Sequence, residues 1–164
     1  MDHLITLDAT GRMVPADRPA LERAVAALLT TAPTDPRELR RAGVGLLALG
    51  RLPDATALLA QALTRAEGPT RIAVRINLGD AHRYAGALDK AEPHYREALR
   101  LARAEHPGLA HFCLQHLGKH RTDQGRLAEA RTLLTEALTL RQVLGDADLV
   151  ASTEAALHRA AGPG

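Results

Sequence analysis

Three segments of this chain share one pattern: GRLPDATALLAQAL (50–63), GALDKAEPHYREAL (86–99) and GRLAEARTLLTEAL (125–138). They superpose without a gap, each with Gly first, Leu two residues later, Ala five residues later and Ala-Leu at the end. The first glycines, at 50, 86 and 125, are 36 and 39 residues apart. A gapless pattern of this length is rarely found three times by chance. The sequence therefore predicts a fold built from a repeated structural unit.

A second helical stretch precedes each of these segments. The stretches are RELRRAGVGLLAL (37–49), AVRINLGDAHRYA (73–85) and FCLQHLGKHRTDQ (112–124), and they carry Gly43, Gly79 and Gly118 at the same phase. The unit is therefore a helix, a glycine turn and a second helix that ends near Pro69, Pro107 or Gly145. One such hairpin cannot bury its apolar face alone, so successive hairpins are expected to stack, with the small residues allowing close helix approach.

The pattern of Leu-Gly, Ala, a large residue and Ala-Leu resembles the tetratricopeptide repeat family, most closely in NLGDAHRYAGALDKAEPHYREALRLA (77–102). The resemblance implies an all-α fold, a right-handed superhelical α-solenoid of about three hairpins with a leading helix and a C-terminal capping helix. The expected boundaries are an N-terminal segment at 1–16, a leading helix and degenerate half repeat at 17–34, hairpins at 36–69, 72–107 and 111–145, and a cap at 148–162.

The N-terminal segment lies outside the repeat. Residues LITLDATGRMV (4–14) fit either a short hairpin around Ala9-Thr10-Gly11 or a frayed first helix, and the sequence does not choose between them.

Composition narrows the class of protein. Hydrophobic residues make up 46% of the 164 residues, with only three aromatics, and this favours close-packed helices over a sheet. The 21 basic and 19 acidic residues interleave, which argues against nucleic-acid binding. No signal peptide or membrane span is apparent, so a cytoplasmic protein is expected. Arginine far outnumbers lysine, which suggests a GC-rich bacterial genome.

The residues that could carry chemistry form no complete site. His116 and His120 have the spacing of a chelating pair on a helix, but no third ligand is evident and Lys119 lies between them. Cys113 has His111 and His116 nearby, but on a helix these point to different sides, and a buried thiol is the simpler interpretation. No phosphate-binding glycine loop is present. We therefore expect no catalytic residue, metal or cofactor.

The family resemblance implies a concave groove, lined by the first helix of each hairpin, that binds another protein or a peptide segment. Helical phase assigns residues of mixed apolar and polar character to this groove. They are Arg37, Arg40, Ile76, Asn77, Asp80, Arg83, Tyr84, Phe112, Gln115, Lys119 and Asp123. Basic groove residues outnumber acidic ones, so an acidic ligand is favoured. The expected function is that of an adaptor or regulatory module.

Two alternatives stay open. Ile76 and Phe112 could pack between adjacent helices instead of facing the groove. The protein could also be a structural module that forms a homodimer through its C-terminal repeat and cap. The clamp that some relatives use for chaperone tails is matched only in part, by Arg40 and Asn77, because Asp80 would repel a terminal carboxylate.

Overall fold

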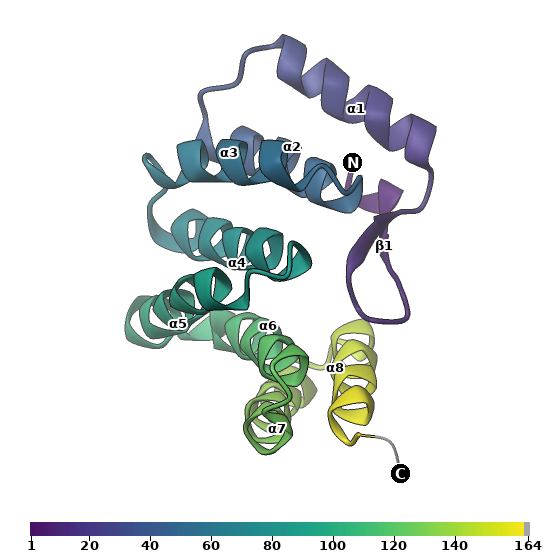
Figure 1. Ribbon diagram of the computed structural model, residues 1–164. Coiled ribbons are helices and arrows are strands. Elements are labelled where there is room, and N and C mark those ends of the chain that lie inside the picture. The colour runs from purple at the N-terminus through teal and green to yellow at the C-terminus, as the bar shows by residue number, and fades with distance from the viewer. Residues whose placement is uncertain (163–164) are drawn as a thin grey trace.

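The computed structural model describes residues 1–162 and shows a stack of helices in the order of the repeats. Three hairpins, α2/α3, α4/α5 and α6/α7, follow a leading helix α1 and precede a capping helix α8 (Figure 1). The helices are α1 Arg18–Thr30, α2 Pro36–Ala48, α3 Leu52–Leu63, α4 Gly68–Tyr84, α5 Leu88–Glu105, α6 Ala110–Asp123, α7 Leu127–Leu144 and α8 Ala147–Ala160. The expected right-handed α-solenoid is confirmed.

The repeated glycines end the first helix of each hairpin. Gly50, Gly86 and Gly125 have φ of 78°, 75° and 74°, a left-handed conformation that glycine adopts without strain. The residue after each glycine donates its N–H back to a carbonyl five residues earlier, as Arg51 does to Leu46. This is the Schellman ending of a helix, and it turns the chain into the second helix.

Helix starts follow equally local rules. Asp35 accepts hydrogen bonds from the backbone N–H groups of Arg37 and Glu38 at the start of α2, and Asp146 accepts one from Leu149 at the start of α8. Pro69 lies in the first turn of α4, where no backbone N–H is required. Pro69 therefore opens a helix, whereas the sequence interpretation had used it to close the previous one.

The other phase-matched glycines let the two helices of each hairpin approach closely. A Cβ at Gly43 would lie 2.7 Å from Leu59 Cγ, and one at Gly118 would lie 2.6 Å from Leu134 Cγ. The buried leucines and alanines of the second helices, Ala55 and Leu59 among them, fill this seam. The repeat pattern thus encodes the packing of each hairpin directly.

Residues 1–16 form the part of the fold that is not a repeat. A short 3-10 helix, η1 Asp2–Leu4, leads into an antiparallel hairpin of β1 Ile5–Leu7 and β2 Met13–Pro15, with Ile5 opposite Pro15. The hairpin and α8 lie on the same side of the helix stack (Figure 1). The N-terminal segment therefore adopts the hairpin alternative and is positioned to cover the concave face.

Candidate functional site

The predicted groove residues lie on α2, α4 and α6, the first helices of the three hairpins, which contact one another in sequence. Most of them are not free to meet a ligand. Ile76 is fully buried in the core between α4 and α6, so its assignment as a groove anchor was wrong. Ile76 belongs to the same buried cluster as Tyr95 of α5 and Leu114 of α6, so it packs between helices.

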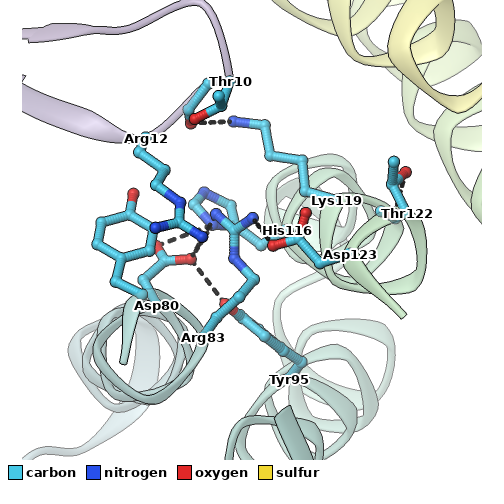
Figure 2. Close-up of polar contacts among 12 residues, drawn as sticks. Thr10, Arg12, Asp80, Arg83, Tyr95, His116, Lys119, Thr122 and Asp123 are labelled. Atoms are coloured by element: carbon cyan, nitrogen blue, oxygen red, sulfur yellow. Dashed lines mark hydrogen bonds and ion pairs between the residues drawn. The ribbon is translucent and has the colours of Figure 1, made fainter. Parts of the chain in front are cut away.

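Asp80 is the centre of a buried polar network (Figure 2). Its Oδ1 accepts a hydrogen bond of 2.7 Å from the Tyr95 hydroxyl, and its Oδ2 lies 3.0 Å from His116 Nδ1. Burial alone would raise the pKa of the Asp80 carboxyl, but His116, Arg83 and Tyr95 outweigh it and hold the pKa well below its usual range. Asp80 is therefore a structural anion rather than a groove contact.

Arg83 connects this network to the rim of the groove. Its Nη1 donates to Asp123 Oδ2 at 3.0 Å, while its Nη2 lies 3.5 Å from Asp80 Oδ1. Burial would lower the pKa of the Arg83 guanidinium, but Tyr95 and Asp80 raise it, so the arginine stays charged. Arg83 is nearly fully buried, and Asp123 is the exposed member of the pair.

The N-terminal hairpin covers the part of the groove where α4 and α6 end, close to Arg83. The Met13 N–H donates to the Tyr84 hydroxyl at 3.0 Å, and Lys119 Nζ donates to the Gly11 carbonyl oxygen at 3.2 Å. Arg12 lies over the Tyr84 ring, 5.2 Å from its centroid. Lys119 is consequently buried, although the sequence placed it on an open surface.

The capping helix covers another predicted residue. Gln115 Nε2 donates to the Ser152 carbonyl of α8 at 3.3 Å, and Gln115 is almost fully buried. Buried Arg141 of α7 holds this helix in place by donating to the Leu149 carbonyl and the Thr153 hydroxyl. The cap therefore closes one side of the concave face.

One end of the groove stays open, where α2, α4 and α6 begin. A hollow of about 490 Å³ there is lined by Arg37, Arg40, Pro69, Thr70, Ile72, Ala73, Leu109 and Phe112. A second hollow of about 430 Å³ is lined by Asp2, Ile5, Arg37, Arg40, Arg41 and Val44. Among the predicted residues, Arg37, Arg40 and Phe112 therefore lie at accessible hollows, while Asn77 is buried and accepts a 2.8 Å hydrogen bond from Arg40 Nε.

Comparison with known families identifies the repeat. Models described as tetratricopeptide repeat match residues 39–104 and 113–148. The chain belongs to the tetratricopeptide repeat family. The matches cover most of each of the three hairpins, so the groove described above is the concave face of a tetratricopeptide array.

Solved structures show the same fold. The nearly identical TPR-like repeats described for a kinesin light chain of Podosopora anserina match with a TM-score of 0.59 and 20% identity, over 87% of this chain and 75% of that chain. BtubC (BKLC) from P. vanneervenii matches with a TM-score of 0.61 and 19% identity, over 86% and 69%. No curated protein matches the sequence. Tetratricopeptide repeats in general serve as protein-interaction scaffolds.

Residues of α5, α6 and the start of α7 form another hollow, which the sequence did not predict. It has a volume of about 840 Å³, and five arginines and two glutamates line it: Arg96, Arg100, Arg103, Arg121, Arg126, Glu92 and Glu129. Most of these arginines are already paired. Arg121 donates to both carboxylate oxygens of Glu92 at 2.7 Å and lowers the pKa of that carboxyl to about 2. Internal pairing leaves this hollow less attractive to an anion than its arginines suggest.

The residues considered for catalysis or metal binding in this tetratricopeptide array are packed in the core or contact carboxylates of neighbouring helices. Cys113 is buried, which raises the pKa of its thiol to about 12. His116 contacts Asp80, whereas His120 lies 3.5 Å from Glu92, so the two histidines serve different carboxylates. Within residues 1–162, no cluster of three His, Cys, Asp or Glu could hold a metal ion. No helix in that range is long and apolar enough to cross a membrane.

Proposed function

We propose that this protein binds a segment of another polypeptide at the open end of its concave groove, and that the segment carries an acidic residue beside an apolar one. The observation that supports this most directly is that Arg37 and Arg40 line both hollows of the open end, while Phe112 and Leu109 line one of them. A bound segment would therefore meet two guanidinium groups, which favour its acidic residue, next to an apolar surface, which favours its apolar residue.

Arg40 is well suited to hold a carboxylate. Its Nε donates to Asn77 Oδ1, so the side chain is oriented before a ligand arrives. The guanidinium presents several donors in a fixed plane, which matches the two oxygens of a carboxylate. Arg40 is partly buried, where solvent screens an ion pair less than at the surface.

Binding rather than catalysis is supported by the surroundings of three residues: Cys113 is buried in the core, and His116 and His120 each lie against a different carboxylate. A protein partner rather than nucleic acid is supported by the balance of 21 basic and 19 acidic residues. A cytoplasmic location stays a prediction of the sequence.

The test is a charge reversal at the open end. A fluorescein-labelled peptide with glutamates flanking two leucines should bind wild-type protein, and Arg37→Glu with Arg40→Glu should weaken binding at least about tenfold, equivalent to about 1.4 kcal/mol. Fluorescence anisotropy measures the affinity. The matched control, Arg23→Glu with Arg71→Glu, makes the same charge change at exposed arginines that line neither hollow. Equal weakening by both pairs would contradict the proposal.

A second candidate function is self-association at the C-terminal end. Of the four large apolar side chains that are exposed among residues 1–162, three lie on the last turns of α7: Leu140, Val143 and Leu144, at 37%, 83% and 56% exposure. Their spacing places them on one face of the helix. An exposed apolar face at the end of a solenoid is where a second copy could stack.

Light scattering at increasing protein concentration tests this candidate. The wild type should form a dimer, and Val143→Lys with Leu144→Lys should remain monomeric because the lysines would bring charge into the interface. Ala26→Lys with Ala27→Lys, at exposed positions on α1 at the other end of the stack, is the control for added charge. A wild type that stays monomeric at high concentration would rule out this function.

A further inference from the structure

The turn of the N-terminal hairpin covers cationic side chains from three helices, of which Figure 2 shows Lys119 reaching up to the turn and Arg83 beneath it. Lys119 of α6 donates to the Gly11 carbonyl oxygen. A Cβ at Gly11 would lie 2.7 Å from Arg159 Nη2 of α8 and 3.5 Å from Lys119 Cε. Arg83 of α4 reaches the same region, where it and Arg12 both lie over the Tyr84 ring. Tertiary packing thus brings Lys119 and Arg159 against the hairpin turn, with Arg83 close enough to act electrostatically on both.

These cations are incompletely neutralised. Arg83 is paired with Asp80 and Asp123, but its buried Nε and Nη2 have no hydrogen-bond partner. Within the described residues, Lys119 and Arg159 form no ion pair, and the acceptor of Lys119 is an uncharged carbonyl. Burial lowers the pKa of the Lys119 ammonium to about 8. Asp80 acts electrostatically on Lys119, and Asp8 and Asp123 act on Arg159, but neither cation has a carboxylate of residues 1–162 within ion-pair distance. Because buried charges are stabilised by paired opposite charges, Lys119 and Arg159 favour an anion beside them.

The hairpin turn is attached through Gly11, which is buried, and Arg12, whereas its tip has few contacts. Residues 6–10 are exposed, and Leu7 retains 48% of its accessible surface. The base of the hairpin differs, because Met1, Leu4, Ile5 and Met13 pack against the apolar core. A segment with few buried apolar contacts opens more readily than the structure around it. The turn can therefore lift while the base stays in place.

Asp8 holds the turn in its closed shape. Its Oδ1 accepts hydrogen bonds from the Thr10 N–H, the Thr10 hydroxyl and the Arg12 N–H, at 2.8, 2.7 and 3.0 Å. Asp8 itself is exposed, so its replacement changes the turn without opening the core.

We propose that Arg83, Lys119 and Arg159 form a second ligand site, specific for a carboxylate-rich peptide segment, which the hairpin turn at residues 7–12 closes. A ligand carboxylate takes the position of the Gly11 carbonyl oxygen when the turn lifts. This site is separate from the open end of the groove and does not depend on it. Only molecules with a lifted turn can bind, so the apparent affinity is the intrinsic affinity multiplied by the fraction of molecules in which the turn is open.

The experiment uses a fluorescein-labelled hexaglutamate peptide and the full chain at low salt, where charge interactions are least screened. Asp8→Ala removes the acceptor that holds the turn and should bind the peptide about tenfold more tightly than wild type, because more molecules are open. Asp8→Asn is the matched control. It removes the same negative charge, which acts on Arg159 in wild type, but keeps an oxygen that can accept the three hydrogen bonds, so it should bind the peptide clearly more weakly than Asp8→Ala.

Adding Lys119→Met to Asp8→Ala should abolish the gain. If that variant does not fold, as circular dichroism would show, Arg159→Met in α8 provides the same test. Adding Arg37→Glu with Arg40→Glu should leave the tenfold ratio unchanged, which separates this site from the open end.

Equal affinities of Asp8→Ala and Asp8→Asn would overturn the proposal, as would a gain that survives the loss of Lys119. Hydrogen exchange at Gly11 and Arg12 should become faster when hexaglutamate binds; unchanged exchange in the bound protein would also overturn it.

Discussion

Replacing Asp80 with leucine should lower the free energy of unfolding by about 3–5 kcal/mol, the usual cost of removing one partner from a buried ion pair. The substitution leaves Arg83 without its buried carboxylate, and the Tyr95 hydroxyl and His116 without their acceptor. All of these groups lie between α4, α5 and α6, so no solvent replaces the lost interactions. Urea denaturation followed by circular dichroism would measure the change.

Asp123→Leu is the matched control, because it removes the other carboxylate of the same arginine from a site where the side chain is 33% exposed. We expect a loss below about 1 kcal/mol there. The pKa of Asp80 is lowered in the folded state, so its stabilising effect is present above the unfolded pKa and is lost as pH falls through the folded value. The gap between wild type and Asp80→Leu should therefore narrow below about pH 4. Equal losses from Asp80→Leu and Asp123→Leu would show that the buried network does not stabilise the fold.

Gly79→Ala should destabilise the protein by about 1–3 kcal/mol through overpacking. A Cβ at this position would lie 2.5 Å from Tyr95 Cε1 and 2.7 Å from Tyr95 Cζ. The Tyr95 ring cannot move aside easily, because it is fully buried and its hydroxyl is bonded to Asp80. The steric cost exceeds the roughly 1 kcal/mol that alanine gains over glycine in a helix.

The control for this substitution is Gly108→Ala. A Cβ at Gly108 would meet nothing within 4 Å, and the residue lies in the short 3-10 helix η2 Pro107–Leu109. Its effect should remain within about 0.5 kcal/mol. If thermal or urea denaturation gave the same stability for both alanine variants, close approach at Gly79 would not be required for the packing of α4 against α5.

The two proposed ligand sites differ in how this chain limits access to them. The open end presents Arg37 and Arg40 beside two hollows, so a partner segment can bind there without rearrangement of the hairpin. The cationic cluster around Lys119 is closed by the chain's own turn. A partner that reached both would have to carry carboxylates far enough apart to span the groove from the start of α6 to its end.

The sequence by itself determined the repeat, the turns and the close packing within each hairpin. Gly50 and its counterparts end helices through their own backbone conformation, and Gly43, Gly79 and Gly118 meet side chains of the adjoining second helix. These interactions are local, so a pattern of residue types at fixed spacing is enough to predict them. The same helical phase assigned Arg37 and Arg40 to the groove face, and it left Phe112 open between the groove and the core.

Only the tertiary structure decided which groove residues a ligand can reach. Helical phase predicted a face for Gln115 and Lys119, but it could not show that α8 and the hairpin cover that face. Ile76 was assigned wrongly because a residue at the edge of a helical face turns inward or outward according to the neighbouring helix. Contacts such as Lys119 with Gly11 join residues 108 positions apart. No local pattern records them, because they depend on how the packed repeats direct both ends of the chain back over the concave face.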